Sequence, residues 1–230
     1  MRALLLGDGL LAAARRSLTR DRFAALALTL TATTAVLLFQ VLQHTAGGAA
    51  LVERIGVVRA SLPLWQSLLR TPMSLFVPAP DLPVWGAAGQ VFVVFGIAEL
   101  TIGRWATLAV AYAGTLAGTL YARHGVQAGA RGTEHLFALP WDDTFVRDTG
   151  PSAAVVALTV YVAWRYRAWL TGGATVLAMV LEQALFPNLA GVEHLAAILC
   201  ALALAGSGEL VAQRLVRTTD AWRPLLPAPP

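Results

Sequence analysis

Ser152 and His194 are the residues whose types and spacing best fit nucleophilic chemistry. An alcohol is a poor nucleophile near neutral pH and needs a base within hydrogen-bond reach. Ser152 stands in "RDTGPSAAVV", and His194 follows 42 residues later in "GVEHLAA". That separation accommodates one helix down, one helix up and two turns, so it returns the histidine to the level of the serine. The spacing is compatible with a Ser–His dyad.

A second set of residues is expected to surround this pair. Ionisable residues inside a membrane are costly and are candidates for function. The candidates for oxyanion binding or for lining a polar cavity are Gln90, Asp148, Gly150, Ala153, Glu182 and Glu193. In the structural alternative, Glu182 and Glu193 are interfacial residues that reach water. One usable histidine with scattered carboxylates lacks the ligand spacing of a zinc site, so we expect no metal and no cofactor.

The composition indicates a bilayer as the solvent of these elements. The chain is 57% hydrophobic and 13% charged, whereas soluble domains carry about 25% charged residues. All 17 basic residues are Arg, which points to a GC-rich genome. The net charge of +4 is small and scattered, so nucleic acid is not an expected partner. The single cysteine, Cys200, excludes an intramolecular disulfide.

The hydropathy pattern predicts an all-α integral membrane protein with a bundle of six transmembrane helices. A span needs about 20 residues, and we find no repeat and no separate soluble domain. A basic segment (1–22) precedes the membrane domain (23–212), and a tail (213–230) follows it. The six predicted spans are 23–43, 85–102, 105–121, 151–164, 168–186 and 194–212.

The arginines predict the orientation of these spans. With the N-terminus in the cytoplasm, eleven of the 17 arginines fall inside, as the positive-inside rule expects. Both termini are then cytoplasmic, in what we expect to be a bacterial plasma membrane. The long connections lie outside. One of them holds residues 62–83, which five prolines prevent from forming one spanning helix. We expect this segment to lie in the outer interface, with Trp65 as an anchor.

The short fourth span places Ser152 below the outer surface. Its 14 residues between Gly150 and Arg165 span about 21 Å, against a hydrocarbon core of about 30 Å. With Arg165 at the inner boundary, the serine lies inside the membrane at the start of a helix. Gly150 and Pro151 suit a loop that dips down to that start. The helix dipole there favours developing negative charge.

Four stretches in this order resemble the rhomboid family of intramembrane serine proteases. "SLLRTPMSLF" resembles the pattern of the family's first outer loop, and "FGIAELTIGRWATLAVAYAGTLAGTL" resembles its second and third helices. "TGPSAAVV" resembles the GxSG nucleophile motif, and "GVEHLAAILCALALAG" resembles the helix that carries the catalytic histidine. The resemblance implies a six-helix core with a water-filled cavity open to the outside. It also implies Ser152 as nucleophile and His194 as general base.

The chain departs from the family at the groups that bind the oxyanion. Ala153 replaces the second Gly of GxSG. Pro83 and Ala87 fall where the family usually has a His and an Asn, and Gln90 is the nearest amide. Val156 stands where the family has a Tyr. Losing one oxyanion donor can cost about 10² to 10³ in rate.

These observations leave three functional hypotheses. The first is a serine endopeptidase that cleaves single-span membrane proteins near the outer leaflet. The second is a pseudoprotease that binds transmembrane helices in membrane protein quality control without cleaving them. The third, a small transporter, is weaker because the polar residues gather at one leaflet. In the structural alternative, Ser152 caps or packs its helix, and His194 locks the fourth and sixth spans together. The partners are transmembrane-helix clients and the bilayer; the oligomeric state is open.

Overall fold

Apolar runs in this chain form helices, since a helix satisfies its own backbone hydrogen bonds. The computed structural model describes residues 9–130 and 139–222, and within these ranges the regular elements are helical, with one isolated bridge between Val58 and Asp148 and no strand. The elements are α2 (Leu10–Asp21), η1 (Arg22–Leu26), α3 (Ala27–Gln43), α4 (Ala46–Ile55), α5 (Leu64–Ser74), α6 (Val84–Ile102), α7 (Arg104–Ala130), η2 (Trp141–Phe145), α8 (Ser152–Arg165), α9 (Trp169–Leu185) and α10 (Leu189–Trp222).

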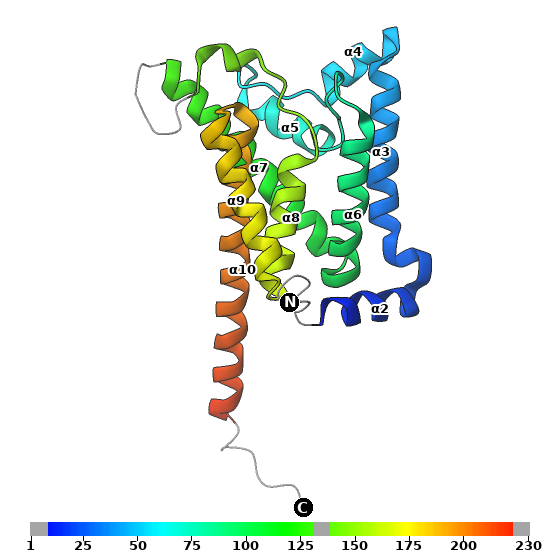
Figure 1. The fold of residues 1–230 in the computed structure, drawn as a ribbon, viewed down its shortest axis with the longest axis vertical. Helices are drawn as coiled ribbons and strands as arrows, with labels where there is room; N and C mark the ends of the chain where they lie inside the picture. The colour runs from blue at the N-terminus through cyan, green and yellow to red at the C-terminus, as the bar shows by residue number, and fades with distance from the viewer. Residues whose placement is uncertain (1–8, 131–138, 223–230) are drawn as a thin grey trace, which may run out of the picture.

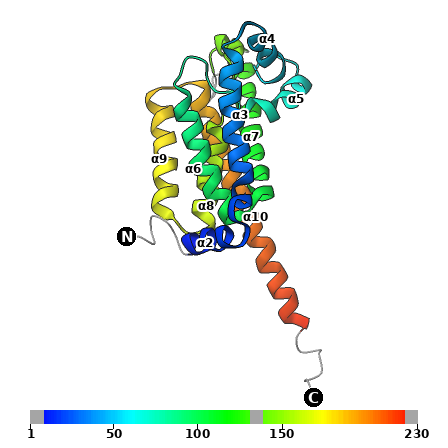
Figure 2. The same cartoon turned by 90° about the vertical axis from the view of Figure 1, so that its right-hand side faces the viewer.

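The long helices form one bundle with α8 at its centre (Figures 1 and 2). Nine of the 14 residues of α8 are buried, all of them Ala, Val or Leu. The helix packs against α6, α7, α9 and α10, and α3 covers the outer side of α6. The sequence of α8 is apolar on nearly every side, and such a helix is stable when other helices surround it. Its N-terminus is the point at which the loop before Ser152 enters the bundle.

Three helical stretches are long and apolar enough to cross a membrane: Leu10–Gln43, Val84–Ile102 and Leu189–Gly208. Ser152–Arg165 and Trp169–Leu185 are shorter apolar helices. Many large apolar side chains on the flanks of the bundle face outward; Leu177 of α9 and Leu199 of α10, for example, are 58% and 67% exposed. Such a surface fits a lipid environment. The prediction of an all-α protein is confirmed for the described residues, and the three long apolar helices support a membrane location.

Each of the six predicted spans overlaps a helix; the first covers η1 and α3, the sixth begins at 194 whereas α10 begins at Leu189, and two ends also differ. The predicted third span ends at residue 121, whereas α7 continues to Ala130. The sixth ends at 212, whereas α10 continues to Trp222 and projects below the bundle (Figure 1). Hydropathy marks the apolar part of a helix and not its end, so polar extensions are missed. The first eight residues of the predicted basic segment and the last eight of the predicted tail lie outside the described residues.

Small residues bring α7, α8 and α10 into close contact. A Cβ on Gly114 of α7 would lie 2.4 Å from the Cβ of Ala157 and 3.8 Å from that of Ala197. One turn further on, a Cβ on Gly118 would lie 3.1 Å from the Cβ of Glu193. The small face of "GTLAGTL" is therefore a packing face, as small residues are in membrane helices. It also brings Glu193 directly against α7.

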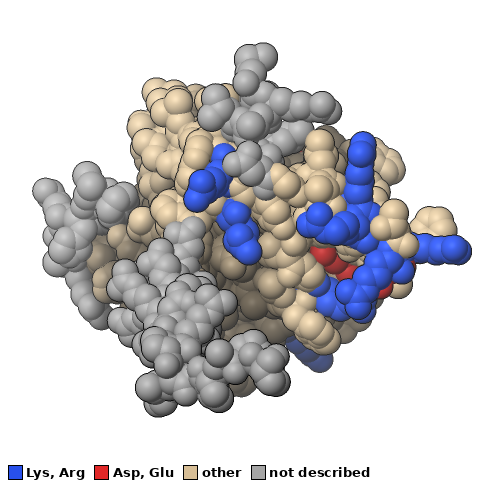
Figure 3. Space-filling model, turned by 90° about the horizontal axis from the view of Figure 1, so that it is seen from below, with Lys and Arg blue, Asp and Glu red and all other residues tan. Residues whose placement is uncertain are grey.

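The lower end of the bundle is basic. There α2 lies across the ends of the long helices (Figure 1), and it exposes Arg15, Arg16 and Arg20. Figure 3 shows basic side chains gathered on this face. The corner into α3 is held by the buried Glu99 of α6, which accepts from the backbone N–H groups of Leu28 and Thr29 at 2.9 and 2.8 Å. Glu99 thus satisfies free donors at a helix start.

Candidate functional site

The loop that delivers Ser152 is held by the first outer segment of the chain. The N–H of Asp148 donates to the carbonyl of Val58 at 2.9 Å, and the N–H of Gly150 donates to the carbonyl of Ser74 at 2.9 Å. Gly150 has φ +120°, a conformation that L side chains rarely adopt. The glycine therefore lets the chain turn from this anchored strand-like segment into α8.

Ser152 is the first residue of α8. Its N-cap is Pro151, no side chain caps the helix, and the first helical bond runs from the N–H of Val155 to the carbonyl of Pro151 at 2.8 Å. The N–H groups of the first turn before Val155 have no partner within the helix. The expectation that Ser152 starts a helix is confirmed. A capping role for its hydroxyl is not, because Pro151 holds the N-cap position and Ser152 makes no side-chain hydrogen bond with the described residues.

Ser152 lies on the wall of an open groove of about 450 Å³. The groove runs between residues 78–83, the first two turns of α6 and the loop at 149–152. Gln90 and Gly150, both predicted site residues, share this groove with Ser152. Pro83 and Ala87 also line it, at the positions where the resemblance to rhomboids puts the oxyanion donors. Ala153 is buried behind the groove.

The ring of His194 is held in place by a residue of α9. Its Nδ1 lies 3.2 Å from Oε2 of Glu182, and its Nε2 is buried without a hydrogen-bond partner. The contact joins α10 to α9 and not, as the structural alternative expected, to α8. Within the part of the chain that the structure describes, no hydrogen bond joins Ser152 to His194, and His194 does not line the groove.

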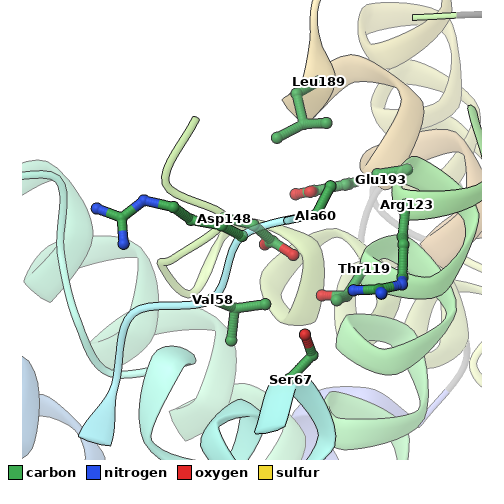
Figure 4. Close-up of a pocket in the computed structure, with 10 residues that line it drawn as sticks. Val58, Ala60, Ser67, Thr119, Arg123, Asp148, Leu189 and Glu193 are labelled. Atoms are coloured by element: carbon green, nitrogen blue, oxygen red, sulfur yellow. The ribbon is translucent and has the colours of Figure 1, made fainter. Parts of the chain in front are cut away.

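Asp148 and Glu193 form a third group. Both line a small cavity at the junction of α5, α7 and α10 (Figure 4). Ser67 and Thr119 line the same cavity. Burial raises the pKa of Asp148, and polar interactions with Thr119 and Glu193 act in the opposite direction.

The predicted residues therefore gather at one end of the bundle but divide into three groups. Ser152, Gln90 and Gly150 share the groove, His194 pairs with Glu182, and Asp148 and Glu193 share the small cavity. Helix direction explains the shared level, because α8 and α10 both start at this end and α9 finishes there. The rotation of each helix about its own axis decides which side chains contact one another. The spacing of residues along the chain does not determine that rotation.

Sequence reasoning missed Ser67, Thr119 and Arg123 at the Asp148 cavity. Thr119 carried a signal, since it follows Gly118 on the small face of α7. Ser67 lies in a segment broken by prolines, where no periodicity marks a buried side. In the predicted orientation Arg123 is one of the arginines outside the membrane, with no role at a site. In the structure its guanidinium donates to the carbonyl of Leu62 at 2.5 Å. It ties α7 to the segment before α5.

Comparison of this chain with known proteins matched no protein-family model, no curated protein and no solved structure.

Proposed function

We propose that this protein is a rhomboid-like intramembrane serine endopeptidase with six membrane-crossing helices and both termini in the cytoplasm of a bacterial cell. Its substrates are single-span membrane proteins, of which an unwound segment enters the groove beside Ser152. One observation carries the proposal. A serine without a structural hydrogen bond begins a central helix on the wall of an open groove, at the end of the bundle that also holds a histidine with a free Nε2.

The pairing of His194 supports a role as base. A carboxylate at Nδ1 fixes the ring and leaves Nε2 as the nitrogen that accepts a proton, which is the logic of a catalytic triad. Glu182 occupies this place at 3.2 Å. Catalytic hydrogen bonds often form only when substrate is bound. We expect Ser152 Oγ and Nε2 to come into contact when a peptide fills the groove.

The chemistry then follows the usual acyl-transfer course. Ser152 Oγ attacks the scissile carbonyl carbon while Nε2 of His194 takes its proton. The free N–H groups at the start of α8 and the amide of Gln90 are the available donors to the oxyanion. The C–N bond breaks as His194 protonates the amine, and water later hydrolyses the ester on Ser152.

A fluorophosphonate probe tests the proposal, because it labels only an activated serine. We expect labelling of the wild type, and a loss of at least about 10³-fold in Ser152→Ala and His194→Ala. The chain has one cysteine, Cys200, so Ser152→Cys in a Cys200→Ser background provides an access control. If a small maleimide reaches Cys at 152 while the wild type stays unlabelled by the probe, the serine is accessible but inactive and the proposal is wrong.

That same outcome would favour the second candidate, a pseudoprotease that binds membrane helices. Two observations support it: Ser152 and His194 are not in contact, and Pro83 and Ala87 give the groove no side-chain donor. A photocrosslinking residue at Ala87 would then capture single-span proteins equally in the wild type and in Ser152→Ala, without cleavage products.

A further inference from the structure

An apolar pocket of about 260 Å³ lies in the lower half of the bundle. It is lined by Val93, Val94 and Ile97 of α6, by the last two turns of α8, by the start of α9 and by Leu10 of α2. In the bundle α8 lies between α6 and α9 (Figure 1). Eight of the ten lining residues are Ala, Val, Ile or Leu, and the other two are Thr. An apolar cavity of about 150 Å³ holds benzene, so this pocket has room for several methylene groups of a hydrocarbon chain.

The rim of this pocket faces the surroundings of the bundle. Val93 and Ile97 line the pocket and are nevertheless 54% and 41% exposed. Leu170, in the first turn of α9, is 47% exposed. Large exposed apolar side chains on a membrane helix contact lipid acyl chains. The pocket is therefore open to a chain that enters from the bilayer.

Two tryptophans mark the membrane boundary at the lower end of the pocket. Trp105 and Trp169 lie in the first turns of α7 and α9, and they are 78% and 49% exposed. Tryptophan is enriched where the hydrocarbon meets the head groups of a membrane. Ala168, which lines the pocket, directly precedes Trp169. The lower end of the pocket therefore lies beside the head-group region.

Two exposed arginines lie at that same level. Arg165 is the last residue of α8, and Arg167 lies in the turn to α9, next to Ala168 of the pocket. Neither forms an ion pair with the described part of the chain. Arg167 has φ +57°, a conformation that is uncommon for a residue with a side chain. Glycine adopts it without strain, so this turn carries its positive charge at a cost.

The helix α2 adds positive charge beneath the pocket. Its first residue, Leu10, lines the pocket, and the helix exposes Arg15, Arg16 and Arg20 on the lower face of the bundle. Figure 3 shows that basic side chains dominate the charged surface of this face. Arginine binds phosphate through charge-assisted hydrogen bonds. An apolar pocket above a positively charged rim is complementary to a molecule with a hydrocarbon chain and an anionic phosphate head.

We infer that this pocket binds one acyl chain of an anionic phospholipid, whose phosphate is held by Arg165 and Arg167. The bound chain fills the space between α6 and α9 and joins both helices to the lower half of α8. The site does not depend on the proposed peptidase activity, since it lies at the opposite end of α8 from Ser152.

The experiment compares two lipids that differ only in their head group. The full-length protein with Cys200→Ser and Val93→Cys carries a small fluorophore on the rim of the pocket and is placed in phosphatidylcholine nanodiscs. Phosphatidylglycerol or phosphatidylcholine, each with the same nitroxide-labelled acyl chain, is then added at low salt, because a nitroxide quenches only a nearby fluorophore.

The expected result is a preference for the anionic lipid at the pocket alone. One basic residue near an anionic lipid is worth about fivefold in affinity. We therefore expect phosphatidylglycerol to quench position 93 at a mole fraction at least about fivefold lower than phosphatidylcholine. The same fluorophore on Leu199→Cys, at an exposed site of α10, reports the bulk lipid and should be quenched by both lipids at similar mole fractions.

Variants of this labelled protein separate the head-group contacts from the pocket. Arg165→Gln with Arg167→Asn removes both charges, and Asn tolerates the left-handed conformation at 167. We expect the preference at position 93 to fall to about one in this double variant and to persist in Arg54→Gln, an exposed arginine of α4 at the other end of the bundle. Thr159→Phe fills the pocket and should reduce quenching by both lipids.

Four results would overturn the inference. Equal quenching of position 93 by the two lipids would show that a chain enters without recognition of its head group. The same preference at position 199 would show a general attraction of anionic lipid to the protein. A preference that survives the double arginine variant would exclude these arginines as the phosphate site. Quenching that Thr159→Phe leaves unchanged would show that no lipid chain enters the pocket.

Discussion

Asp148 and Ser152 are four residues apart and serve two different environments. Asp148 lines a small cavity of about 10 Å³ together with Glu193, Ser67 and Thr119. Ser152 faces an open groove of about 450 Å³. The cavity leaves room for about one water molecule among polar side chains from distant segments, whereas the groove has room for a ligand. The cavity therefore positions the loop, and the groove has the room for chemistry.

This contrast predicts that the cavity controls stability more than the groove does. Asp148→Ala removes a carboxyl that lines the cavity beside the buried Glu193, and we expect a loss of about 1–3 kcal/mol in the free energy of unfolding. Ser152→Ala removes a hydroxyl without a hydrogen bond, so we expect a change within about 0.5 kcal/mol. Chemical unfolding of both variants at neutral pH measures the difference. Similar losses in the two would remove the distinction between the sites, and Asp148→Asn is the isosteric control.

Glu182 contacts His194, the proposed base. For this residue we expect a large effect on activity and a small effect on stability. Glu182→Gln should slow fluorophosphonate labelling by about 10²-fold and barely change stability, because its side chain is 32% exposed. A carboxylate at Nδ1 orients the ring and stabilises the imidazolium that forms during the reaction, so its loss slows the reaction. Glu182→Asp should keep most of the labelling rate, and an unchanged rate in the Gln variant would mean that Glu182 only packs against His194.

The contribution of the groove can be tested by adding a donor at a position where the resemblance to rhomboids expects one. Ala87 lines the groove on α6, and Ala87→Asn would place an amide beside Ser152. We expect labelling to accelerate by about tenfold, since one oxyanion donor is worth up to about 10² to 10³. Ala87→Leu is similar in size and offers no donor, so it should not accelerate the reaction. An equal response to Asn and Leu would show that the amide does not reach the reacting carbonyl.

The smallest effect is expected at the half-buried pair of Glu53 and Arg59. A hydrogen bond from Arg59 lowers the pKa of Glu53 below its ordinary value of 4.5. The pair therefore stabilises the fold above that pH, and the contribution is lost as pH falls through the lowered pKa. We expect Glu53→Gln to cost less than about 1 kcal/mol at pH 7 and nothing once Glu53 is protonated. Unfolding at both pH values measures this, and a larger cost at acid pH would contradict the assignment.

The sequence was a good guide to the elements and to the level of each polar residue. Helices lie over all six predicted apolar spans because hydropathy and helix length follow directly from composition. The common level of Ser152, Glu182 and His194 follows from alternating helix direction. The bend at Gly150 was also readable, since Gly before Pro marks a turn into a helix.

The partners of those residues were decided by the tertiary structure. His194 contacts Glu182 and not Ser152, and Asp148 shares a cavity with Glu193. Helix rotation and the close approach of α7 and α10 at Gly118 set which sides face each other. The contacts of Ser67 and Val58 with the site depend on how a proline-broken segment folds back over the bundle. Local sequence encodes which residues are polar and how deep they lie. Only packing between distant segments decides which of them touch.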